Sequence, residues 1–123
     1  MPIRALLVPV LALNLAAADV ELKVGTSAEN REIQGEATSF TVAADTKLWA
    51  WTRVSKVGKA IQIVFEKGGD VVFSQELNVP RSPHRTRACR TFRAGDSGTW
   101  VAKVIDSDGK ERAKVTFTVK VEG

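Results

Sequence analysis

The sequence predicts an all-β protein, namely an immunoglobulin-like antiparallel β-sandwich of about seven or eight strands without a disulfide. Apolar and polar residues alternate with period two over most of the chain after residue 19, which is typical of half-buried strands. Turn-forming residues interrupt these runs at intervals of about ten to twelve residues, as in sandwich folds. Cys89 is the only cysteine, so an internal disulfide is excluded.

The alternation is clearest in the last expected strand. Its two faces consist of Ala113, Val115, Phe117, Val119 and Val121 on one side, and Lys114, Thr116, Thr118 and Lys120 on the other. Shorter runs with the same period occupy residues 20–24, 40–43 and 61–66. Strands of this kind bury one face and expose the other to water, as in an antiparallel sheet.

Turn signals separate the expected strands. Lys67-Gly68-Gly69-Asp70 and Asp106-Ser107-Asp108-Gly109 are both suited to hairpin connections. Residues 79–84 contain two prolines and are expected to form a loop or an edge. Asp106 and Asp108 also resemble the start of a calcium loop, but no bidentate glutamate follows at the required spacing, which favours the hairpin.

The first 18 residues have the pattern of a signal peptide. Arg4 supplies the positive start, an apolar run extends from Ala5 to Leu15, and Ala16-Ala17-Ala18 provides a small-residue cleavage site. The run is too short for a membrane-spanning helix, and its lack of an amphipathic pattern argues against a packed N-terminal helix. We therefore expect export of a single Ig-like domain, residues 19–123, to the periplasm or the outside of the cell. The absence of a cysteine at residue 19 predicts a soluble product.

The charge balance is modestly basic. Of the 18 Lys and Arg residues, only Arg4 precedes residue 19, which leaves 17 basic against 14 acidic side chains. This surplus favours anionic partners slightly but lacks the concentrated charge of a nucleic-acid-binding protein, so no nucleic acid is expected as a partner.

Catalysis is not expected. Ser97 lies in Gly-Asp-Ser-Gly, which resembles a serine-protease nucleophile motif, but the only histidine, His84, lies in a proline-flanked segment without an evident orienting partner. One histidine and one cysteine also cannot build a zinc or other transition-metal site. The sequence therefore predicts no enzyme activity, no catalytic residues, no metal and no cofactor.

A structural corner explains the same segment better. Asp96, Gly98 and Trp100 occupy the positions of Asp, Gly and Tyr in the D-x-G-x-Y-x-C segment that enters strand F of immunoglobulin domains. Trp100 can fill the corner and donate its indole N–H to the upstream backbone. Ala102 stands at the cysteine position, in agreement with the missing disulfide.

Three longer segments resemble the bacterial family described as domain of unknown function 2914: LWAWTRV, IQIVFEKGGDVV and HRTRACRTFRAGDSGTWVAKVIDSDGKERAKVTFTV. Arg85-Thr86 matches the arginine-threonine step of that family's pattern, and Phe117-Thr118-Val119 matches its close. The chain departs from the pattern at Ile63 and Phe65, where the family has His and Trp, and at His84, where an aromatic residue usually precedes the arginine. The resemblance implies an exported β-sandwich and no assigned activity.

An arginine-rich segment is the first candidate binding site. It comprises Arg81, His84, Arg85, Arg87, Arg90 and Arg93. In an extended strand Arg85, Arg87 and Arg93 share one face, where guanidinium groups can hold sulfate, phosphate or carboxylate groups. The alternative is a basic edge strand that discourages sheet-to-sheet aggregation. Cys89, within this segment, is interpreted as a small buried residue rather than a reactive thiol.

Two tryptophans are the second candidate site. Trp49 and Trp51 share one face of a strand and can stack on sugar rings or anchor a protein partner if that face is exposed. Alternatively, they lie in the core opposite Trp100, with Arg53 at the rim. The opposite face of residues 47–54 is also apolar, so the period leaves the buried side undecided.

Together these features predict a non-catalytic protein-interaction or accessory module of the bacterial cell envelope, with a protein partner or self-association. The alternative is a carbohydrate- or polyanion-binding domain that takes an anionic polysaccharide on the arginine-rich strand and an exposed tryptophan.

Overall fold

The computed structural model describes residues 19–29 and 32–122. The strands are β1 (Val20–Gly25), β2 (Ser27–Glu29), β3 (Glu32–Gln34), β4 (Ser39–Ala43), β5 (Thr46–Val54), β6 (Ala60–Lys67), β7 (Asp70–Asn78), β8 (His84–Phe92), β9 (Gly98–Ile105) and β10 (Glu111–Glu122). The described residues contain no helix, and the prediction of an all-β sandwich is confirmed. The expected signal peptide lies outside the described residues.

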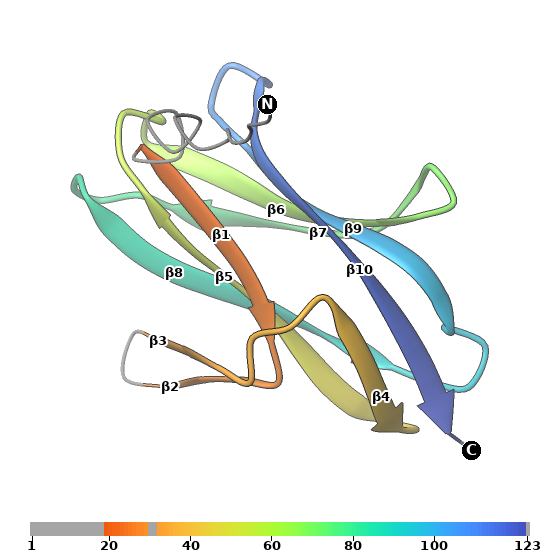
Figure 1. Cartoon of the computed structure of the whole chain (residues 1–123). Helices are drawn as coiled ribbons and strands as arrows, with labels where there is room; N and C mark the ends of the chain where they lie inside the picture. The colour runs from red at the N-terminus through yellow and green to blue at the C-terminus, as the bar shows by residue number, and fades with distance from the viewer. Residues whose placement is uncertain (1–18, 30–31, 123) are drawn as a thin grey trace, which may run out of the picture.

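Two main sheets form the layers of the sandwich (Figure 1). One has the strand order β1-β5-β8, and the other has the order β4-β10-β9-β6-β7. When β2, β3 and β4 are left aside, the arrangement is that of immunoglobulin domains. In one sheet β1, β5 and β8 correspond to strands A, B and E, and in the other β6, β9 and β10 correspond to C, F and G. β7 lies beside β6 in the place of C′.

The strand count exceeds the expected seven or eight because of two short additional strands, β2 and β3. β2 and β3 form a hairpin of their own, and β4 is a five-residue strand at the edge of the larger sheet. β4 pairs with β10 in parallel, whereas every other strand pair in the described residues is antiparallel. β2 and β3 have three residues each, too few for a period-two pattern to reveal them, whereas β4 coincides with the alternating run at residues 40–43.

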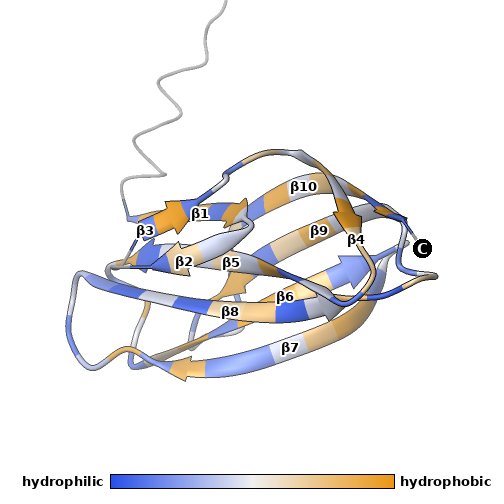
Figure 2. Cartoon of the chain, turned by 90° about the horizontal axis from the view of Figure 1, so that it is seen from below, coloured by the Kyte–Doolittle hydropathy of each residue, from blue (hydrophilic) through white to orange (hydrophobic). Residues whose placement is uncertain are grey.

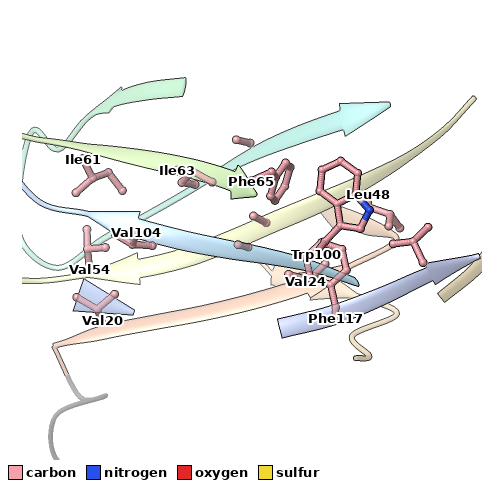
Figure 3. Packing of buried hydrophobic residues seen from close by; sticks show 14 of the residues in the cluster. Val20, Val24, Leu48, Val54, Ile61, Ile63, Phe65, Trp100, Val104 and Phe117 are labelled. Carbon is pink, nitrogen blue, oxygen red and sulfur yellow. The ribbon is translucent and has the colours of Figure 1, made fainter. Parts of the chain in front are cut away.

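The core lies between the two sheets (Figure 3). Trp100, Phe65 and Phe92 are fully buried there, and the ring centroids of Phe92 and Trp100 are 4.8 Å apart in an edge-to-face arrangement. Burial of each such side chain contributes roughly 1.5–3 kcal/mol through the hydrophobic effect. Ile63 and Phe65 point into this core and are 0% exposed. The departures from the family pattern at these positions are therefore changes of core packing.

The orientation of β5 shows which face of residues 47–54 is buried, a choice that the period-two pattern left undecided. Leu48, Ala50 and Val54 face the core, so Trp49 and Trp51 point away from the sandwich interior. Trp51 is nevertheless only 6% exposed, because the β2–β3 hairpin lies across this outer face. A Cβ atom at Gly25 would come within 2.7 Å of the Ile33 side chain, which shows how closely the hairpin approaches the sheet.

The β9–β10 hairpin is held by the Asp106 carboxylate. Its Oδ1 accepts hydrogen bonds from the backbone N–H groups of Asp108 and Lys110, and its Oδ2 accepts one from Arg112. The Lys110 hydrogen bond, opposed by burial and supported by the Arg112 and Asp108 donors, lowers the pKa of Asp106. No group of three or more potential metal ligands lies within residues 19–29 and 32–122. The carboxylate thus serves the turn, as expected for the hairpin interpretation.

The described part of the chain has no helix with the length and apolarity required to span a bilayer.

Candidate functional site

A cationic pocket forms where the end of β5 meets the beginning of β8 and the loop that precedes it. It has a volume of ≈ 260 Å³ and is lined by Arg53, Arg81, Pro83, His84 and Arg85. Antiparallel pairing places Arg53 directly opposite Arg85, and Val54 opposite His84. In Figure 2 the beginning of β8 is hydrophilic, whereas residues nearer its middle are apolar. We call this hollow the arginine pocket.

The arginines of this pocket carry an excess of positive charge. Arg53 makes one distant ion pair with Glu21, 3.7 Å between nitrogen and oxygen. Neither Arg81 nor Arg85 has an acidic partner among the described residues. Three guanidinium groups around one pocket, with Glu21 as their single acidic partner among the described residues, repel one another and favour a bound anion, which they can grip through paired N–H groups.

A second hollow of ≈ 430 Å³ adjoins the arginine pocket. Its lining comprises Glu21, Lys23, Glu32, Ile33, Glu36, Trp51, Arg53 and Arg85. Arg53 and Arg85 belong to both hollows. The carboxylates of Glu32 and Glu36 have no ion-pair partner among the described residues. We call this hollow the glutamate hollow.

The two outer-face tryptophans are engaged by cations. The guanidinium carbon of Arg87 lies 5.5 Å from the centroid of the Trp49 ring, and Lys23 Nζ lies 5.4 Å from that of Trp51. Such contacts contribute roughly 0.5–1 kcal/mol each at partly exposed sites. Trp49 is half-buried and Trp51 is buried, so the pair does not form an open platform on which a sugar ring can stack.

The sequence-predicted arginines separate into distinct environments. Arg81, His84 and Arg85 converge in the arginine pocket, and Arg87 lies on the same outer face beside Trp49. Arg93, in contrast, follows the end of β8 and pairs with Asp45 at 3.4 Å. It was expected to share a face with Arg85 and Arg87, but the strand ends at Phe92 and the chain turns before Arg93.

Arg90 and the corner residues have a structural role at the other end of β8. Asp96 Oδ2 accepts hydrogen bonds from Arg90 Nη1 at 3.1 Å and from the Arg93 backbone N–H at 2.8 Å. The Arg90 guanidinium also lies 4.9 Å from the Trp100 ring centroid. Gly98 has φ +145°, a conformation that side-chain-bearing residues rarely adopt, at the entry to β9.

Arg53 is the pocket residue that the sequence did not assign to a binding role. Its place in the pocket follows from the pairing of residues 46–54 with residues 84–92, which brings Arg53 and Arg85 together. These segments lie on either side of β6 and β7 in the chain, so local patterns do not reveal their register.

Cys89 and Ser97 occupy structural positions. Cys89 was expected to be buried, but it is only half-buried, because it lies opposite Trp49 in the β5–β8 pair and so shares the outer face of the sheet. Ser97 Oγ accepts a hydrogen bond from the backbone N–H of Val121 at 2.9 Å. The hydroxyl that resembled a protease nucleophile thus secures the last strand.

One known protein family has a sequence profile that matches this chain. The sequence profile of a protein family of unknown function, DUF2914, matches residues 58–119, which is half of the chain. The chain belongs to the DUF2914 family. The match runs from just before β6 into β10 and includes Arg81, His84 and Arg85, whereas Arg53 precedes it.

Other comparisons add little to the DUF2914 assignment. No curated protein matches the chain. A crystal structure described as an engineered protein is similar to 86% of the chain, with 16% sequence identity and a TM-score of 0.47. The chain spans 21% of that protein's length.

Proposed function

We propose that this DUF2914 domain is an exported, non-catalytic binding module that recognises an anionic group on its partner. One observation carries the proposal: Arg81 and Arg85, which have no acidic partners among the described residues, converge with Arg53 on one pocket. The recognised group is a sulfate, phosphate or carboxylate, since these match the planar fork of a guanidinium group.

The non-catalytic part of the proposal rests on how the chain uses its nucleophiles. Ser97 Oγ accepts a backbone hydrogen bond, and Cys89 lies within a strand beside Trp49. The single histidine, His84, borders the arginine pocket. Export is supported by the signal-peptide pattern of the first 18 residues.

Anionic polysaccharide is the partner that this charge distribution favours over uncharged sugar. A neutral sugar is usually recognised by an open aromatic face, and both outer-face tryptophans are occupied by cations. Because Arg81 and Arg85 are exposed, each ion pair with an anionic polysaccharide contributes only about 0.2–1 kcal/mol, so several must act together. Binding that depends on them weakens as salt screens the charges.

Chromatography on heparin, a sulfated polysaccharide, tests this function with the domain of residues 19–123. We expect retention that decreases with salt, and clearly earlier elution after Arg81→Ala or Arg85→Ala. Arg93→Ala is the matched control, because it removes the same charge from an exposed arginine outside the pocket. If all three variants elute together, retention reflects net charge alone and the proposed site is wrong.

A protein-interaction function has separate support at the opposite sheet. β7 is an edge strand, and Val71 and Val72 on it are 60% and 43% exposed. Exposed edge strands with apolar residues are common sites of strand pairing between proteins. Sedimentation that shows salt-insensitive self-association, abolished by Val71→Lys, would support this second candidate. A monomer at all concentrations would contradict self-association at β7.

A further inference from the structure

The two adjoining hollows carry unpaired charges of opposite sign. Arg81 and Arg85 face the arginine pocket without acidic partners, and Glu32 and Glu36 line the glutamate hollow without basic partners among the described residues. Arg53 and Arg85 line both hollows, so they form the boundary between the two charged ends. The site therefore has a direction, from a cationic end to an acidic end.

The two ends have separate origins in the fold. The cationic end comes from β5, β8 and the loop before β8, whereas Glu32 belongs to β3 and Glu36 follows it. The β2–β3 hairpin brings these carboxylates over the outer face of the smaller sheet, where it also covers Trp51. Glu32 and Glu36 thus add two carboxylates to a face that already carries Glu21 together with Lys23, Arg53 and Arg85.

This arrangement favours a ligand that carries both signs of charge over one that is uniformly anionic. A ligand with negative charge along its whole length would place part of that charge beside Glu32 and Glu36, where like charges repel. The cationic end of a ligand would instead be attracted by Glu32 and Glu36, which outnumber Lys23, the one base of the glutamate hollow that the arginine pocket does not share. Complementary placement of both signs gives specificity by rejecting the wrong ligand as well as attracting the right one.

We propose that the combined site binds a zwitterionic ligand, with its phosphate, sulfate or carboxylate group in the arginine pocket and its ammonium group in the glutamate hollow. The proposal rests on the anion-binding function above and names the ligand class for the same site. An ammonium group fits the acidic end because it offers several N–H donors and a positive charge to carboxylates that have no other partner. Free amino-phosphates, amino sugars with acidic groups and zwitterionic lipid headgroups share this chemistry.

Calorimetric titration of the domain with phosphoethanolamine and with inorganic phosphate tests the proposal. We expect phosphoethanolamine to bind about three- to tenfold more tightly, as two partly exposed ion pairs predict. The double variant Glu32→Gln/Glu36→Gln removes the acidic end without removing the side chains. It should weaken phosphoethanolamine binding to the level of phosphate, while phosphate binding stays equal or becomes tighter.

The control is Glu76→Gln, which removes an exposed carboxylate from β7 in the other sheet. It should leave the preference for phosphoethanolamine unchanged. Phosphate binding without any preference, or a double variant that strengthens both ligands alike, overturns the zwitterion proposal and leaves anion binding intact. If the unaltered domain binds neither phosphate, phosphoethanolamine nor heparin, the proposed function itself is wrong.

Vesicles distinguish the source of the zwitterion. If the ligand is a lipid headgroup, phosphatidylethanolamine vesicles should carry the protein into the pellet, and excess phosphoethanolamine should release it. If the ligand is free or polymer-bound, phosphoethanolamine should bind in solution while vesicles leave the protein in the supernatant.

Discussion

The indole Nε1 of Trp100 donates a hydrogen bond to the backbone carbonyl oxygen of Asp96, 2.7 Å away. This contact closes the corner at which the chain enters β9, in the place where immunoglobulin domains use a tyrosine hydroxyl. Trp100 is fully buried, so the hydrogen bond satisfies an indole N–H that would otherwise lack a partner in the core. The corner therefore ties the hydrophobic core to the turn before β9.

Replacement of Trp100 by phenylalanine tests this corner. The substitution removes the N–H donor and leaves a cavity, so we expect the free energy of unfolding to fall by about 2–4 kcal/mol. Chemical denaturation measures the change. Trp49→Phe is the control, because Trp49 is half-buried on the outer face, and it should cost clearly less. Equal losses for the two variants would contradict the special role of the corner.

The Asp96 carboxylate predicts a loss of stability in acid. Burial raises its pKa, but the Arg93 N–H and the Arg90 guanidinium outweigh this effect and hold the pKa below the ordinary value of 3.8. A lowered folded-state pKa means that the contribution is fully present above the unfolded pKa and is lost as the pH falls through the folded pKa. We expect Asp96→Asn to destabilise the domain at pH 7 and to reduce the acid dependence of its unfolding free energy below about pH 4. If the unfolding free energy of the variant falls in acid as steeply as that of the unaltered domain, Asp96 does not contribute to the acid dependence.

Ser97→Ala tests the structural role of the serine in the Gly-Asp-Ser-Gly motif. Loss of the Oγ acceptor leaves the Val121 N–H without its partner at the end of β10. Amide hydrogen exchange at Val121 should accelerate, and the free energy of unfolding should fall by about 1 kcal/mol. Ser74→Ala, on the exposed edge strand β7, should change neither quantity. Unaltered exchange at Val121 would argue against the hydrogen bond.

Fluorescence quenching tests the placement of the three tryptophans. Trp100 and Trp51 are 0% and 6% exposed, so their emission should be blue-shifted and shielded. Trp49 should provide the quenchable component, and iodide should quench it more than caesium because Arg87 lies beside its ring. Trp49→Phe should remove that component. A quenchable signal that survives this substitution would place another tryptophan at the surface.

The sequence by itself predicted the fold class, the family and the corner residues. Period-two alternation reports which positions of a strand share a face, and residues 113–121 show it over a whole strand. The corner was predictable because Asp96, Gly98 and Trp100 lie close together in the chain and act through local geometry. The arginine-rich segment was visible for the same reason, since its members are near neighbours in sequence.

Only the tertiary structure decided which face of β5 is buried and which arginines converge. Both faces of residues 47–54 are apolar, and the choice depends on the packing of the larger sheet against Leu48, Ala50 and Val54. Arg53 joins Arg85 through a pairing between strands that are distant in the chain. The glutamate hollow arises because the β2–β3 hairpin folds across the outer face of the smaller sheet. Contacts between distant segments depend on the register and packing of the whole chain, and no local pattern encodes them.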